Sequence, residues 1–246
     1  MQESRSMPPG SIELYAQRTS AREALRPIDR HFRLGELAYI SLKEALVRGQ
    51  FRAGQKLTVR GIAEGLRIST SPARDAIMRL IEEGALANAG PKTIVVPALT
   101  LATLDEVTSI RLALEPLAAS IATERIAGDT VERLKRLNSQ IFNETNHCAM
   151  LMADKAFHFC VYEGAQMPRM AAMIESLWMR IAPSLNELSA TFADQQSGAA
   201  NHMQAIIGLQ DRDKALVQAA IDKDIRDGYQ QLVGRLKQLR GRHRRA

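Results

Sequence analysis

The chain has 246 residues and a formal net charge of +6 at neutral pH, and 46% of its residues are hydrophobic. This length suffices for two domains of ordinary size, and a composition with only 4% aromatic residues favours helices over sheets. No apolar run is long enough to cross a bilayer and no signal-peptide pattern opens the chain. These features exclude membrane-spanning and secreted proteins and predict a cytoplasmic protein without a membrane partner. Its two cysteines are too few for a disulfide framework.

The positive charge is unevenly distributed along the chain. Basic residues exceed acidic ones up to residue 97 and again from residue 235 onward, whereas acidic residues prevail between them. Such a split suits a nucleic-acid-binding module joined to a domain with a different task. We therefore expect four segments: a flexible arm over residues 1–33, a DNA-binding domain over 34–97, a helical domain over 98–240 and a basic tail over 241–246.

The stretch from residue 58 to residue 84 predicts two short helices joined by a tight turn. Its start and stop signals are a capping hydroxyl at Thr58, a second start at Ser71 and Pro72, and a stop at Gly84. A preceding helix over residues 34–46 would pack beneath this pair, and a hairpin of two short strands over residues 86–96 would follow it.

Three polar residues, Thr70, Ser71 and Arg74, lie near the start of the second helix and off its apolar stripe. A helix-turn-helix presents this end to base edges and phosphates, and an arginine there can pair with guanine or hold a phosphate. The alternative is an ordinary pair of packed helices in which Arg74 is simply solvated.

The run from Thr70 to Gly84 resembles the recognition-helix signature of the GntR family of winged-helix transcriptional regulators. The resemblance implies a homodimer that binds a double-stranded DNA operator with two half-sites. It also implies two further DNA contacts, Arg60 in the preceding helix and Lys92 at the tip of the wing. The family usually has arginine where this chain has Thr70.

From residue 100 onward every periodic pattern is helical. The expected helices cover residues 101–127, 129–143, 149–164, 167–188, 197–209 and 211–239. Short connections between them predict an antiparallel arrangement. The fold class we expect is therefore mainly α, with an N-terminal winged helix-turn-helix domain and a C-terminal all-helical antiparallel bundle.

The block from Arg111 to Ala119 resembles the start of the FCD domain, the ligand-binding domain of the FadR-like branch of the GntR family. The resemblance implies a helical bundle that senses a small molecule. Arg111 could face its pocket and bind an anionic effector. The alternative role of Arg111 is an ion pair with Glu115.

Asp154 and His158 stand four residues apart, so that both lie on one helix face and can reach one cation. His202 opens a later expected helix and Asp224 lies on the last one; inward side chains of an antiparallel bundle can converge. By spacing alone these residues could equally be unrelated surface or core groups. The resemblance to metal-binding FCD domains implies Asp154, His158 and His202 as ligands, with Asp224 at the position of a further histidine. Mixed nitrogen and oxygen ligands suit a divalent Zn, Ni, Mn or Fe ion.

We therefore predict a transcriptional regulator, taken to be a repressor, whose operator binding responds to a small organic acid in a metal-containing bundle. One alternative is a metal-free regulator of an acyl or aromatic ligand. A second alternative is a metal-dependent hydrolase or lyase that uses the same Asp/His cluster. We expect no enzyme, because the sequence places no additional acid/base pair beside that cluster.

Overall fold

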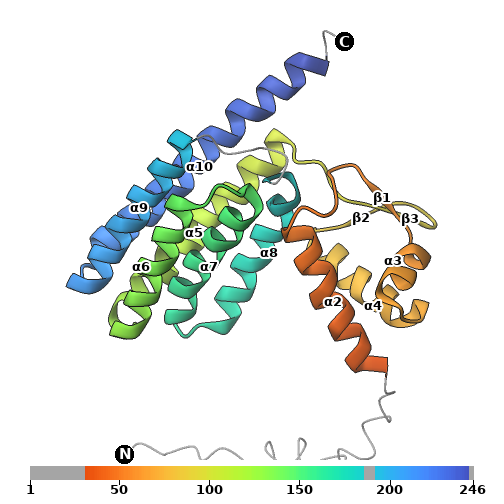
Figure 1. Ribbon diagram of the computed structural model, residues 1–246, viewed down its shortest axis with the longest axis horizontal. Coiled ribbons are helices and arrows are strands. Elements are labelled where there is room, and N and C mark those ends of the chain that lie inside the picture. Colours follow the sequence, from red (N-terminus) through yellow and green to blue (C-terminus); the bar gives the residue numbers. More distant parts are fainter. Residues whose placement is uncertain (1–30, 186–191, 244–246) are drawn as a thin grey trace, which may run out of the picture.

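The computed structural model describes residues 31–185 and 192–243, which form a small winged-helix module beside a larger helical bundle (Figure 1). The fold is mainly helical, as the sequence predicts. The expected arm up to residue 30 and the end of the expected tail, residues 244–246, lie outside the described residues. Residues 31–33, which we assigned to the arm, form the first turn of α2, and residues 241–243 continue α10.

The winged-helix module contains three helices and a three-stranded antiparallel sheet in the order β1-β3-β2. The helices are α2 (His31–Val47), α3 (Val59–Leu66) and α4 (Thr70–Glu82), and the strands are β1 (Lys56–Leu57), β2 (Ala87–Gly90) and β3 (Thr93–Val95). The hairpin of β2 and β3 is the wing. The sequence did not reveal β1, because two residues are too short for a periodic signal; Leu57 pairs with Ile94 across the sheet.

The start of α4 differs from the prediction. Thr58 caps α3 as expected, since its Oγ1 accepts a 3.0 Å hydrogen bond from the Gly61 amide. In α4, however, the N-cap residue is Ser69 and the helix begins at Thr70, so Ser71 is not the cap and Pro72 is the third helical residue. A proline is tolerated throughout the first turn, because amides there have no intrahelical partner, and it marks that turn without fixing its first residue.

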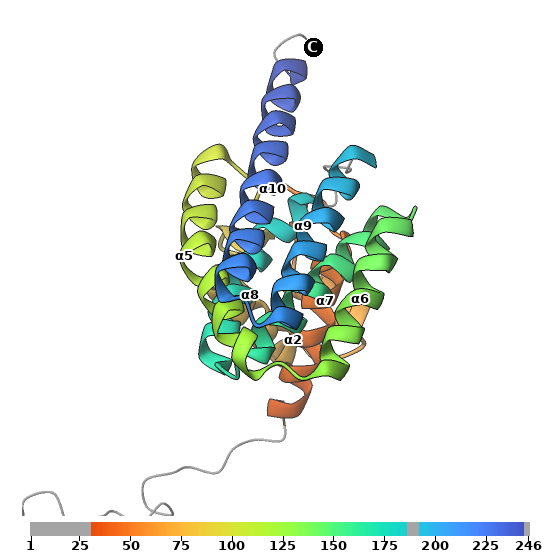
Figure 2. The ribbon, with the colours of Figure 1, turned by 90° about the vertical axis from the view of Figure 1, so that its left-hand side faces the viewer.

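The bundle contains six helices among the described residues, and consecutive helices run antiparallel. They are α5 (Leu101–Arg125), α6 (Gly128–Asn143), α7 (His147–Gly164), α8 (Pro168–Leu185), α9 (Phe192–Asp211) and α10 (Lys214–His243). Figure 2 shows α10 between α5 and α9 and extending past both. None of the described helices is long and apolar enough to cross a membrane.

Several predicted boundaries in the bundle are wrong. Helix α6 begins at Gly128, one residue before the predicted boundary, and the Asp129 side chain accepts from the adjacent Thr130 amide. Helix α10 begins at Lys214 and not at residue 211, and Asp213 caps it through a 3.0 Å bond from the Leu216 amide. Helix α9 begins before residue 197, so His202 lies in its middle and does not open it. The expected end of the fourth helix, residues 186–188, lies outside the described residues.

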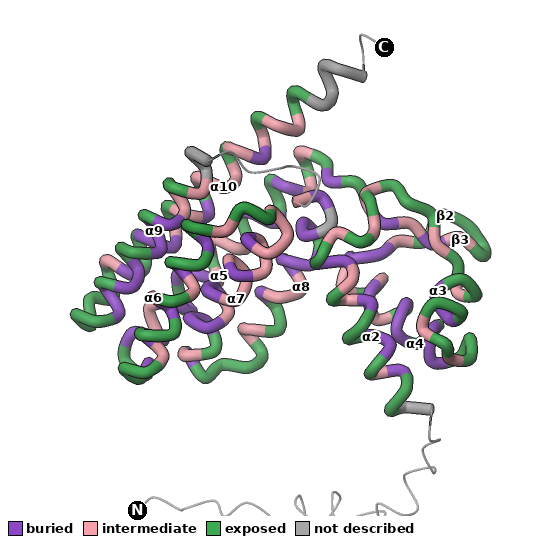
Figure 3. The backbone as a smooth tube through the Cα atoms, in the orientation of Figure 1, coloured by how far each residue is buried: buried purple, intermediate pink, exposed green. Residues whose placement is uncertain are grey.

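Buried side chains separate into a bundle core, a winged-helix core and a smaller cluster between α5, α8 and α10 (Figure 3). Phe157 and Tyr162 are among the largest fully buried side chains of the bundle, and Leu46 and Leu80 are among those of the winged-helix module. Apolar residues at helical spacing produce both cores, because each helix buries one stripe against its neighbours.

Candidate functional site

The N-terminal end of α4 presents Thr70, Ser71 and Arg74 to solvent. The opposite face of the same helix is buried through Ala73, Ala76, Ile77 and Leu80. This separation leaves the polar end available to a DNA groove while the apolar stripe fixes the helix on the module.

The two other predicted DNA contacts are also exposed. Arg60 lies on α3 with 85% of its side chain exposed, and its Nε is 2.8 Å from the Glu64 carboxylate. An exposed pair of this kind is weak and can open toward a phosphate. Lys92 occupies the turn between β2 and β3, at the tip of the wing.

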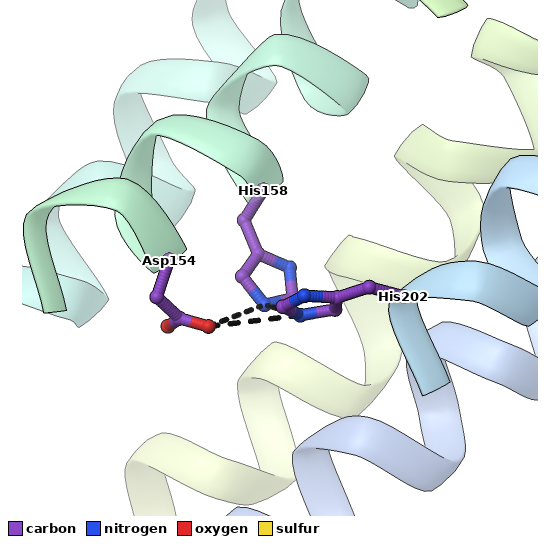
Figure 4. A group of neighbouring side chains, drawn as sticks. All are labelled: Asp154, His158 and His202. Carbon is purple, nitrogen blue, oxygen red and sulfur yellow. Dashed lines mark hydrogen bonds and ion pairs between the residues drawn. The ribbon is translucent and has the colours of Figure 1, made fainter. Parts of the chain in front are cut away.

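Within the bundle, two imidazoles and a carboxylate point at one another from α7 and α9 (Figure 4). Nε2 of His158 lies 3.2 Å from Nε2 of His202, and the Asp154 carboxylate lies 3.6 Å from Nε2 of His202 and 3.9 Å from Nε2 of His158. The side chains of both histidines are buried. Asp154 and His158 share the inner face of α7 because they are one helical turn apart.

Asp224 completes the group from α10. Its Oδ2 lies 3.2 Å from Nε2 of His158 and 3.8 Å from Nε2 of His202. The buried Asn201 of α9 donates from Nδ2 to Asp227 at 2.9 Å and, more distantly, to Oδ1 of Asp224 at 3.4 Å. Asp224 can reach the two histidines because α9 and α10 approach closely. A Cβ at Gly208 of α9 would lie 2.7 Å from the Val217 side chain of α10.

A buried network behind His158 determines which of its nitrogens carries a proton. The Tyr162 hydroxyl donates to Glu115 at 2.6 Å, so its oxygen accepts from Nδ1 of His158 at 3.0 Å. Nδ1 of His158 therefore carries a proton, and Nε2 faces Asp154, His202 and Asp224. In the neutral ring Nε2 presents a lone pair, and in the protonated ring it donates to Asp224.

Glu115 is fully buried and accepts hydrogen bonds from three side chains. Arg111 binds it through Nε at 2.7 Å and Nη2 at 3.2 Å, and the indole N–H of Trp178 donates to it at 3.1 Å. Together with Tyr162, these donors satisfy both carboxylate oxygens. Neither Tyr162 nor Trp178 was among the predicted site residues. Tyr162 had a usable signal, since it lies one helical turn beyond His158, but Trp178 comes from a separate helix without any local signal.

The pKa values of the cluster favour positive charge at its centre. Burial alone would lower the pKa of His158, but the hydrogen bond to Asp224 and the charge of Asp154 raise it. Burial alone would raise the pKa of Asp224, but the imidazoles of His202 and His158 lower it. Burial raises the pKa of Asp154 despite the same imidazoles. Two carboxylates facing two imidazole nitrogens therefore attract a cation, either protons or a metal ion.

A cavity of about 150 Å³ adjoins the cluster. Asp154, His158 and Asp224 contribute to its wall together with Arg111, and apolar side chains such as Met150, Ile181 and Leu232 form other parts. This cavity is small compared with the pockets of drug-sized ligands, and its mixed lining suits a small polar molecule.

The donor set fits a divalent metal ion. Nε2 of His158, Nε2 of His202 and the Asp154 carboxylate lie close enough together to bind one ion, and the Asp224 carboxylate faces both imidazoles from α10. Several first-row metals accept such mixed nitrogen and oxygen ligands. The hydrogen bond from His158 to the Tyr162 oxygen resembles the outer-shell contacts that orient ligands in metal sites. Nδ1 of His202 is buried without a hydrogen-bond partner among the described residues, and this ring is held by stacking on Phe157 at a centroid distance of 4.0 Å.

Two protein-family models match the chain in consecutive segments. The model described as bacterial regulatory proteins, gntR family, matches residues 34–96, and the model described as FCD domain matches residues 106–227. The chain belongs to the GntR family. The members of this family with an FCD domain form its FadR-like branch, so the resemblance seen in the sequence is confirmed.

Named relatives of this GntR regulator agree with the assignment. It is 29% identical over 178 residues to the HTH-type transcriptional regulator McbR of Escherichia coli K12, over 70% of this chain and 80% of that protein. It is 28% identical over 156 residues to the Nta operon transcriptional regulator of Aminobacter aminovorans, over 63% of this chain and 71% of that protein.

Solved structures show the same architecture. The E. coli McbR/YncC structure matches with a TM-score of 0.75 and 26% identity, over 84% of this chain and 98% of that one. A GntR regulator from Rhodococcus sp. RHA1 matches with a TM-score of 0.70 at 18% identity, which supports the fold alone. The protein is thus a DNA-binding transcriptional regulator with an FCD domain and not an enzyme.

Proposed function

We propose that this GntR regulator binds a small organic acid in the cavity of its FCD bundle, and that the ligand modulates binding to an operator. The observation that carries the proposal is the convergence of Asp154, His158, His202 and Asp224 at the wall of a cavity that Arg111 also lines. Together with Arg111, these residues come from the four helices α5, α7, α9 and α10, so the arrangement of the bundle can depend on what the cavity holds.

A divalent Zn, Ni, Mn or Fe ion would be held by those two aspartates and two histidines. When bound, the metal would supply a Lewis-acidic anchor for a carboxylate. The chain itself contributes the orientation of its ligands, since Tyr162 determines which nitrogen of His158 carries a proton in the neutral ring. Because metal and protons compete for the same atoms, metal binding should weaken as the pH falls.

Arg111 supports an anionic effector. Its guanidinium lines the cavity while it binds Glu115, and its guanidinium carbon lies 4.7 Å from the centre of the Trp178 ring. A guanidinium fixed in this way would attract an acid and also favour one orientation of its carboxylate. The limited volume favours a small acid over the long acyl ligand of the metal-free alternative.

On the DNA side, we propose that Arg60, Thr70, Ser71, Arg74 and Lys92 contact an operator. A homodimer would present two such surfaces to an inverted repeat, since a two-fold protein matches a two-fold site. The regulator would act as a repressor whose operator complex is weakened or strengthened according to the arrangement of the bundle that the effector prefers.

Mass spectrometry under native conditions tests these statements together, on protein purified without chelators. We expect the mass of two chains, one metal ion per chain and, in some preparations, a retained acid; elemental analysis then identifies the metal. Metal-free protein that still binds a longer acyl or aromatic ligand would contradict the metal proposal and favour the alternative. Monomeric mass at micromolar concentration would contradict the homodimer.

A further inference from the structure

Helix α8 packs against both parts of the molecule. Ile174 and Trp178 belong to the bundle core, whereas Met179 and Ala182 belong to the core of the winged-helix module. Met179 is fully buried there. A core residue from the bundle therefore completes the DNA-binding module, and the two parts do not have separate cores in this region.

The outer face of α8 contacts the C-terminal end of the recognition helix α4. The Ser176 hydroxyl donates to the Glu83 carbonyl at 3.4 Å. The Arg180 side chain covers Gly84, where an added Cβ would lie 3.0 Å from the guanidinium carbon. Gly84 has φ +78 and follows the end of α4, and this conformation favours glycine. A cation at a helix C-terminus also interacts favourably with the negative end of the helix dipole.

A series of polar contacts links α8 to the C-terminal end of α4 through α2. Glu175 of α8 binds Lys43 at 2.7 Å and Lys155 of α7 at 3.1 Å. Lys43 in turn donates to the Tyr39 hydroxyl at 3.0 Å, and Tyr39 donates to the Glu83 carboxylate at 2.7 Å.

Lys43 keeps its positive charge within this series of contacts. Burial alone would lower the pKa of Lys43, but Glu175 and Tyr39 raise it, so Lys43 stays a cation. Its side chain is only 15% exposed, which protects the ion pair with Glu175 from solvent screening. This pair therefore holds α2 against α8 more firmly than an exposed surface pair would.

We propose that Glu175, Ser176, Met179 and Arg180 of α8 are positioning residues for the recognition helix. None of them needs to touch DNA. They fix the C-terminal end of α4 relative to the bundle and so determine how its N-terminal end, with Arg74, meets a groove. Base-reading contacts depend on such orientation, because a bidentate pair tolerates little displacement.

The same helix carries Trp178, which is hydrogen-bonded to Glu115 behind the Asp/His cluster. A shift of α8 would therefore be transmitted to the recognition helix as well. This connection to the effector rests on the function proposed above, whereas the positioning role does not, and the experiment below is done without effector or added metal.

The test uses the full chain and a fluorescein-labelled duplex enriched from a random library by the wild-type protein. Two variants remove the groups of α8 that face α2 and α4 without opening a cavity in either core. They are Glu175→Gln, which weakens two ion pairs, and the double change of Ser176→Ala with Arg180→Ala, which removes a hydrogen bond and a cation. Met173→Ala is the matched control, since Met173 lies on the same helix with 60% of its surface exposed. Duplex affinity is measured at one salt concentration, together with amide hydrogen exchange over residues 79–86.

Both test variants should bind the duplex about five- to tenfold more weakly, as expected for the loss of one or two hydrogen bonds or ion pairs. Exchange over residues 79–86 should accelerate while exchange in α9 stays as in the wild type. When Arg180→Lys replaces Arg180→Ala in the double variant, part of the lost affinity should return, because lysine keeps the cation. Wild-type affinity and exchange in both variants would overturn the proposal, and so would an equal acceleration throughout the bundle, which indicates general destabilisation.

Discussion

The Tyr162 hydroxyl accepts a 3.0 Å hydrogen bond from Nδ1 of His158, which leaves Nε2 of that ring directed at two carboxylates. The change Tyr162→Phe removes this acceptor and frees the ring to adopt the other tautomer. We expect metal affinity to fall about tenfold or more, as for other outer-shell partners of metal ligands. Competition with a chelating dye measures it. Unaltered affinity would show that Tyr162 does not orient the ligand.

Removal of a proposed ligand should separate metal binding from DNA binding. The change His158→Ala should abolish metal retention, whereas duplex binding measured without effector should persist, because the recognition helix lies in the other module. His147→Ala is the control: His147 lines the cavity, but its Nε2 is 3.1 Å from the Leu185 carbonyl. Elemental analysis compares the two proteins. One metal ion per chain in His158→Ala would refute the ligand set.

Arg74→Ala should weaken binding to the enriched duplex by about 1–3 kcal/mol if Arg74 reads a base. Binding to random duplex should then change little, because non-specific affinity comes mostly from phosphate contacts. Fluorescence anisotropy across a series of salt concentrations distinguishes the two roles. An equal loss on both duplexes, with a salt dependence reduced by about one counterion, would assign Arg74 to a phosphate instead.

Glu115→Gln should destabilise the protein strongly. The change leaves the mostly buried guanidinium of Arg111 without a carboxylate, and breaking a buried pair from one side typically costs about 3–5 kcal/mol. The upper part of that range is not expected, since the Arg111 side chain is 12% exposed and glutamine still accepts one hydrogen bond. Urea unfolding followed by circular dichroism measures the difference.

The matched control for that experiment is Glu132→Gln. Glu132 pairs with Lys135 at 2.8 Å on the surface of α6, where 59% of the Glu132 side chain and 38% of the Lys135 side chain are exposed. Such pairs contribute about 0–1 kcal/mol, so little change in unfolding free energy is expected. Similar losses of unfolding free energy in both variants would mean that the buried Arg111–Glu115 pair stabilises the protein no more than an exposed pair does.

Local patterns in the sequence determined which segments are helical and what each one carries. Thr58 and Gly84 frame their helices as predicted, because capping and helix termination depend on a few neighbouring residues. Asp154 and His158 share a helix face for the same kind of reason, since their spacing is one helical turn. The neighbourhood of Arg111 and Glu115 likewise follows from their spacing along α5.

Only the tertiary structure decided which of these faces meet. The approach of His202 and Asp224 to His158 depends on how α9 and α10 pack against α7, and helix packing is set by side chains far apart in the sequence. The same holds for Trp178 beside Glu115 and for Met179 in the core of the winged-helix module. No periodicity within α8 distinguishes these two partners, because an apolar stripe specifies that a face is buried but not against what.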